Sequence, residues 1–144
     1  MVFAFDRDWT VDVNPPSGER EAVPLKWVRH LAHETDYEVW AIGNQDLKAE
    51  ADIPGIVELA ERYYDEGIER LSEQDEYGYY EFWPLRRERL WMLAEIFPKA
   101  TEYVVVDDLD LSDIEGWAHY HAWDFVPAVE RDNICIGFPS NSRK

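Results

Sequence analysis

The chain has 144 residues, 46% of them hydrophobic, so it is long and apolar enough for one domain with a buried core, which argues against a disordered chain. Its formal net charge of −17 excludes a broad surface for nucleic acid phosphates. Acids spread along the chain with few lysines are typical of proteins from salt-loving organisms, where molar salt reduces the screening length to about 3 Å. An ordinary acidic cytoplasmic protein is the alternative.

No targeting or membrane-spanning segment is expected. The start of the chain lacks a basic stretch followed by an apolar run, which argues against a signal peptide. No apolar run approaches the roughly 18 residues needed to span a membrane. Cys135 is the single cysteine, so no disulfide can form within the chain, and its apolar neighbours indicate an inert core residue. We therefore expect a cytoplasmic protein.

Strands and helices are expected to alternate along the chain. Short apolar runs rich in β-branched and aromatic residues indicate buried strands, whereas apolar residues at helical spacing indicate helices. In chain order, these patterns predict a strand at 1–6, a helix at 24–35, a strand at 37–45, a helix at 54–71, a short edge strand near 79–83, a helix at 84–98, a strand at 101–108, a partly helical segment at 111–130 and a strand at 133–138. The alternation predicts an α/β fold with a three-layer, doubly wound, mostly parallel sheet in one domain over residues 1–144.

Three of the predicted strands end in polar residues. These are Asp6 and Asp8, then Gly43 and Asn44, then Asp107 and Asp108. Ligands of open α/β sheets bind beyond the carboxyl ends of the strands, so we expect the acids to converge there. Clustered carboxylates repel one another unless a cation lies among them, and oxygen ligands suit Mg²⁺ or a similar hard ion. For any one acid, a turn or cap residue is the alternative.

The stretch VFAFDRDWTV, which begins at Val2, resembles the first motif of the haloacid dehalogenase-like superfamily, whose members are mostly phosphatases. That motif is a buried strand followed by Asp-x-Asp-x-Thr. The resemblance implies that Asp6 is a nucleophile that forms an aspartyl-phosphate and that Asp8 is the general acid and base. It also implies that Thr10 helps to hold the phosphate-binding loop.

The stretch YVVVDDLDLSD, which ends at Asp113, resembles the fourth motif of the same superfamily, an apolar strand that ends in acids. The resemblance implies a Mg²⁺ site with Asp108 as the first choice of ligand, beside the Asp6 carboxylate and the Asp8 carbonyl. Asp107 and Asp113 are the further candidate ligands.

The chain departs from the superfamily pattern at the two other motifs. The basic residue that neutralises the phosphoryl group is normally Lys, and here Arg86 or Arg87 takes that role, with Lys99 as a fallback at the other end of the predicted helix. The second motif places Ser or Thr at the end of the second strand. Gly43 stands there instead, so phosphate would be bound by its backbone N–H or by Asn44.

The segment between residues 45 and 83 is too short for the large cap domain that many members carry. The resemblance therefore implies a capless member, in which the acidic stretch 72–83 forms either a small flap or an edge hairpin. Capless members often use a macromolecular substrate or an oligomer to cover the site. The expected partner is a phosphorylated substrate, small or macromolecular, and the surplus of aromatic residues is compatible with a homodimer.

Three functions follow from these patterns. The first is a Mg²⁺-dependent phosphatase. The alternative is a catalytically weak or inactive module that binds metal, phosphate or a partner, motivated by the missing hydroxyl at Gly43. The third is a phospho-acceptor regulator with a flavodoxin-like sheet, phosphorylated at Asp107 or Asp108. His119 and His121 are interpreted as part of an aromatic segment on the sheet, with a pocket wall and a zinc-binding pair as alternatives.

Overall fold

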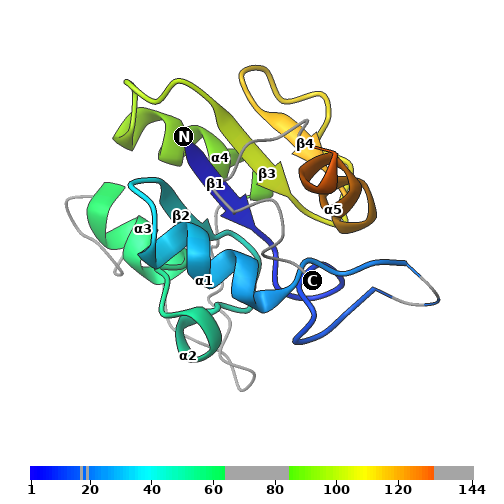
Figure 1. Ribbon diagram of the computed structural model, residues 1–144. Helices are drawn as coiled ribbons and strands as arrows, with labels where there is room; N and C mark the ends of the chain where they lie inside the picture. The colour runs from blue at the N-terminus through cyan, green and yellow to red at the C-terminus, as the bar shows by residue number, and fades with distance from the viewer. Residues whose placement is uncertain (17, 19, 64–84, 132–144) are drawn as a thin grey trace.

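The computed structural model describes residues 1–16, 18, 20–63 and 85–131, and Figure 1 shows their arrangement. The strands in this part of the chain are β1 (Val2–Phe5), β2 (Glu38–Ala41), β3 (Tyr103–Val106) and β4 (Ala118–Tyr120). The helices are α1 (Leu25–His33), α2 (Lys48–Ala51), α3 (Ile56–Tyr63), α4 (Arg86–Ile96) and α5 (Ala122–Glu130). The predicted α/β fold is therefore confirmed for the described residues.

The strands form one parallel sheet in the order β2-β1-β3-β4 within the described ranges. Phe5 at the end of β1 pairs with Ala41 of β2 and with Val106 of β3. These three strands end at one level, so the residues that follow them, including Asp6 and Asp107, meet at one edge of the sheet. The chain continues from β1 to β2 on one side and later to β3 on the other, and this reversal creates a crevice between β1 and β3.

Helices cover both faces of the sheet, which gives three layers (Figure 1). Alternate side chains of β1 point to opposite faces. Phe3 and Phe5 pack with residues of α1 and α5, whereas Val2 and Ala4 pack with residues of α3 and α4. All four side chains are buried, and full burial of a Val or Phe side chain contributes about 1.5–3 kcal/mol. Burial on both faces explains why this strand is a continuous apolar run.

The sequence patterns miss two short elements, α2 and β4. A helix of four residues and a strand of three are too short to show a period, so neither has a signal of its own. The segment 111–130 contains β4 and then α5, and its predicted helical part is thus confirmed. The strands predicted near 79–83 and at 133–138, which includes Cys135, lie outside the described residues, as does the end of the helix predicted over 54–71.

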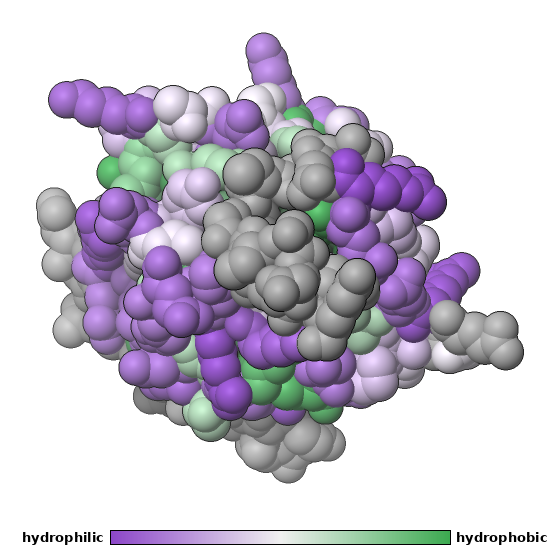
Figure 2. Space-filling view, viewed as in Figure 1, coloured by the Kyte–Doolittle hydropathy of each residue, from purple (hydrophilic) through white to green (hydrophobic). Residues whose placement is uncertain are grey.

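Hydrophilic residues dominate the part of the described surface that Figure 2 shows. Figure 2 shows one face, on which hydrophobic areas of the described chain are small and separated by hydrophilic ones. This agrees with the excess of acidic over basic residues in the sequence. Among the described helices, none has the length and apolarity that a membrane crossing requires.

Candidate active site

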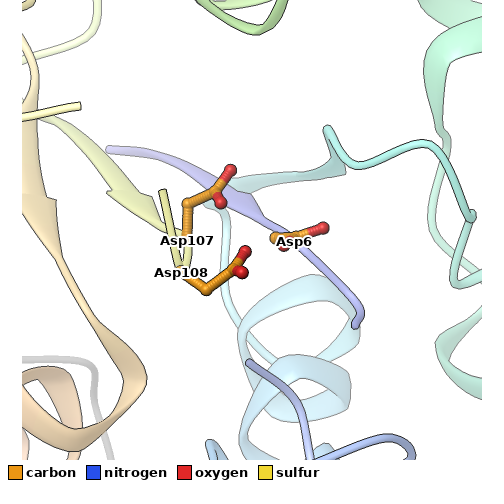
Figure 3. A group of neighbouring side chains, drawn as sticks. All are labelled: Asp6, Asp107 and Asp108. Carbon is orange, nitrogen blue, oxygen red and sulfur yellow. The ribbon is translucent and has the colours of Figure 1, made fainter. Parts of the chain in front are cut away.

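Three aspartates meet in the crevice between β1 and β3. Asp6 follows β1 directly, and Asp107 and Asp108 follow β3, so the parallel pairing of these strands brings the acids together. Each offers a carboxylate oxygen, and these oxygens all lie within 4.8 Å of one another. Asp6 and Asp107 are buried and Asp108 is half-buried (Figure 3). The convergence expected from the sequence is thus observed for these three residues.

Arg86 is the basic residue of this cluster. It is the first residue of α4, and its Nη1 donates a hydrogen bond to Oδ2 of Asp107 and lies 3.8 Å from Oδ2 of Asp6. Its buried Nε has no hydrogen-bond partner among the described residues. The charged guanidinium of Arg86, held beside the carboxylates, suits an anion that approaches the cluster.

The pKa values of the acids reflect this crowding. Burial, the charge of Asp107 and a hydrogen bond with Asp108 together raise the pKa of Asp6 to about 9, and the opposing charge of Arg86 offsets only part of this shift. Burial likewise raises the pKa of Asp107, although Arg86 opposes the shift. The cluster therefore holds a proton easily unless another cation replaces it.

The donor set fits a hard divalent cation. Asp6, Asp107 and Asp108 offer only carboxylate oxygens, which are the ligands that Mg²⁺ prefers. When all three are ionised and Arg86 is charged, the group carries a net charge of −3 + 1 = −2, which a divalent ion balances.

Asp8 lies outside this cluster, in the loop that follows β1. Its Oδ1 accepts hydrogen bonds from Arg7 Nη1 at 2.7 Å and from Asn14 Nδ2 at 2.9 Å. Within the described chain, no hydrogen bond to its other oxygen is found, and the side chain is 31% exposed. Asp8 is therefore held in place through one of its two carboxylate oxygens.

Thr10 is fully buried beneath the same loop. Its carbonyl accepts a hydrogen bond from the N–H of Val23 at 2.8 Å, which ties the loop to the segment before α1. Its hydroxyl oxygen has no partner among the described residues. Thr10 thus anchors the loop through its backbone.

Gly43 lies directly against Asp6. A Cβ at position 43 would stand 2.1 Å from Oδ1 of Asp6, far inside van der Waals contact. The sequence departs from a Ser or Thr here, and the structure supplies a steric reason: the space of a side chain is occupied by the Asp6 carboxylate.

Arg89 is a site residue that the sequence analysis did not find. It lies one helical turn after Arg86, is 4% exposed, and donates to the Ile42 carbonyl at 2.6 Å and to Oδ1 of Asn44 at 2.9 Å. Burial lowers its pKa to about 10. These bonds turn the oxygen of the Asn44 amide toward α4, which leaves the NH₂ group to donate elsewhere. The spacing of three from Arg86 is the signal that could have indicated it.

Arg87, Asp113 and Lys99 are not part of the cluster. Nη2 of Arg87 bonds to both carboxylate oxygens of Asp113, at 3.0 and 2.9 Å, in an ion pair at the surface. Lys99 lines a cavity with Met1 and Val2, at the opposite end of the strands. Of the three basic candidates, only Arg86 contacts the acids.

His119 and His121 contact the backbone of the acid cluster. His119 Nε2 and His121 Nδ1 each lie 3.1 Å from the carbonyl oxygen of Asp107, and their rings are 4.8 Å apart. They therefore face the backbone of an acid-cluster residue.

Comparisons with known proteins add no family to this geometry. No protein-family model, curated protein or solved structure matches the chain. What the site can do therefore follows from its own residues: carboxylates that suit a divalent cation, an arginine that suits an anion, and a separate, partly exposed carboxyl group on Asp8.

Proposed function

We propose that the protein is a Mg²⁺-dependent phosphomonoester phosphatase with the chemistry of the haloacid dehalogenase-like superfamily. The observation that carries the proposal is the convergence of Asp6, Asp107 and Asp108 with Arg86 at the ends of β1 and β3. Together these residues suit a divalent cation and a phosphoryl group, which are the two charged partners of such a reaction.

In the first step, a carboxylate oxygen of Asp6 attacks phosphorus, and the bond from phosphorus to the ester oxygen breaks. Asp8 gives its proton to the leaving oxygen, so an alcohol departs and an aspartyl-phosphate remains. In the second step, Asp8 takes a proton from water, which attacks phosphorus and releases inorganic phosphate and free Asp6. Arg86 offsets the charge of the phosphoryl oxygens in both steps.

Asp6, Asp107 and Asp108 would hold Mg²⁺, and the Asp8 carbonyl is a further ligand that the family resemblance implies. When bound, the ion lowers the repulsion between the carboxylate and the phosphoryl group. Asp6, which burial favours in its protonated form, would be ionised in the metal-loaded site and so able to act as a nucleophile.

For the fold, we infer a capless member of the superfamily. The parallel sheet with helices on both faces supports this, and the stretch between β2 and α4 is short for a large cap. An open site favours a substrate that covers it, as a macromolecule or an oligomer partner would.

The test is hydrolysis of an aryl phosphate in molar KCl, with and without Mg²⁺. We expect Mg²⁺-dependent turnover by the wild type and a loss of at least about a thousand-fold in Asp6→Asn, because the nucleophile is removed. Asp52→Asn is the matched control, since it makes the same change on an exposed residue at the end of α2. Turnover that survives in Asp6→Asn, or that needs no divalent ion, would contradict the proposal.

The second candidate is a module that binds metal and phosphate without turnover. The specific observation in its favour is Gly43, where the superfamily has a hydroxyl. Calorimetry that finds Mg²⁺ binding in a protein with no activity on a panel of phosphomonoesters would favour it. A phospho-acceptor role for Asp107 is disfavoured, because this carboxylate is fully buried and bonded to Arg86 and to the N–H of Leu109.

A further inference from the structure

We propose that the cavity beside Asp108 binds a planar aromatic leaving group, so that the preferred substrates are phosphomonoesters of small aromatic compounds. This inference rests on the proposed phosphatase function and names its substrate class. The cavity has a volume of about 330 Å³. Its lining residues are Trp9, Pro16, Arg20, Asp108 and Trp123.

Asp108 connects this cavity to the reacting centre. Its carboxylate belongs to the acid cluster around Asp6, and the same residue lines the cavity. A group bound in the cavity therefore lies next to a phosphoryl group bound at Asp6. This favours an aromatic ring attached to the ester oxygen directly or through a short link.

Trp9 is placed at the cavity at an energetic cost. Its φ of 63° lies in the left-handed region, which is unfavourable for a bulky residue and which Gly or Asn adopts more easily. Its side chain is 48% exposed, so core packing does not compensate. The N–H of Trp9 donates a hydrogen bond to the Asn14 carbonyl at 2.8 Å. The loop that carries Asp6 and Asp8 therefore also fixes the position of the Trp9 indole. Such strain is typical of functional positions.

The second wall of the cavity is formed by stacked side chains around Trp123, which His121 connects to the acid cluster. His121 contacts the Asp107 carbonyl, and its ring stacks on Trp123 at 4.6 Å with an angle of 9° between the planes. The guanidinium of Arg20 lies over the same indole, 4.4 Å from its centre. Guanidinium and indole groups both stack on flat aromatic rings. A ring bound in the cavity can therefore stack on Arg20 and on Trp9.

The test measures binding of phenylphosphonate and methylphosphonate, which are not hydrolysed, to the Mg²⁺-loaded wild type by calorimetry. We expect phenylphosphonate to bind about ten-fold more tightly, in line with the stacking of one ring on aromatic side chains. In Trp9→Asn, which keeps a residue that tolerates the left-handed backbone, this preference should fall to about one. In Trp9→Phe it should largely return.

Trp91→Ala is the matched control. Trp91 is 52% exposed on α4 and is not among the residues that line the cavity, so this variant should keep the wild-type preference. Equal affinity of the wild type for the two phosphonates, or an unchanged preference in Trp9→Asn, would overturn the inference. If the protein prefers phenylphosphonate but hydrolyses no phosphomonoester, the aromatic-binding cavity is supported and the phosphatase proposal fails. The failure of one proposal can therefore be told from the failure of the other.

A nucleobase and a phenyl ring share this chemistry, and a further arm separates them. Adenosine 5′-monophosphate and phenyl phosphate are titrated into Asp6→Asn, in which turnover is blocked. Tighter binding of the nucleotide would assign the cavity to a nucleobase, and tighter binding of phenyl phosphate to a simple aryl group. Affinity of both no better than that of methyl phosphate would overturn the inference.

Discussion

Asp6 is the residue in which the competing requirements of this site are most visible. It follows a buried strand, lies beside two other acids, and fills the space that a side chain at position 43 would need. Burial and like charges both favour its protonated form, whereas a nucleophile must be ionised. A bound cation resolves this conflict, so the charge of Asp6 should be linked to metal binding.

This linkage predicts how stability depends on pH. The folded-state pKa of Asp6 is about 9 and its usual value is 3.8, so the folded protein keeps a proton that the unfolded chain releases. The stabilising contribution is therefore full below pH 4 and is lost as the pH rises through 9, with a slope of up to about 1.4 kcal/mol per pH unit for one proton. Urea unfolding in EDTA between pH 5 and 9 measures it.

In Asp6→Asn, the free energy of unfolding should lack the part of its pH dependence that Asp6 causes. In the wild type, Mg²⁺ should reduce the same pH dependence because the cation replaces the proton. Asp52→Asn makes the same substitution on an exposed residue outside the cluster and should keep the wild-type profile. Parallel pH profiles of wild type and Asp6→Asn in EDTA would contradict the linkage.

At the scale of elements, α4 connects the two halves of the site. Arg86 at its start contacts the acids after β1 and β3, and Arg89 one turn later bonds to the residues after β2. One helix thus fixes the positions of three strand ends relative to one another. The hydrogen bonds of these two arginines matter because they are shielded from solvent. Each guanidinium takes the place of water around the polar groups at this edge of the sheet.

We predict that Arg89→Met lowers the free energy of unfolding by about 1–3 kcal/mol, because the buried carbonyl of Ile42 loses its donor. Arg87→Met is the control on the same helix. Its ion pair with Asp113 is exposed, and such pairs contribute about 0–1 kcal/mol. Urea denaturation of both variants at one salt concentration is the measurement, and equal losses would contradict a positioning role for Arg89.

For the molecule as a whole, the large negative net charge is the dominant feature. A net charge of −17 repels itself within a compact chain, and salt screens that repulsion. The screening length falls from about 10 Å at 0.1 M to about 3 Å at 1 M. The folded state should therefore depend on salt far more than the hydrophobic core alone would require.

The urea midpoint at pH 7 should rise continuously as KCl increases to molar concentrations. Near the sequence pI of about 4.4 the net charge is close to zero, so the same addition of KCl should have a much smaller effect. A KCl effect of equal size at both pH values would indicate that salt acts on the hydrophobic core rather than through charge.

The alternation of strands and helices, and the acids that follow two of the strands, can be predicted from the amino-acid sequence. Buried strands have a strong local signal, since runs such as Val2–Phe5 must be apolar on both faces. The expected meeting of Asp6, Asp107 and Asp108 also follows from sequence, because parallel strands end at one edge. Short elements such as α2 and β4 have no such periodic signal.

The basic and acidic candidates that join the cluster can be told from the others only by how the elements pack together. Adjacent residues of α4 differ in direction by about 100°, so Arg86 faces the acids while Arg87 pairs with Asp113 at the surface. The glycine at position 43 became intelligible only through its contact with Asp6, which lies on another strand. Such contacts join residues far apart in the chain and depend on packing distances, which no local pattern of residues encodes.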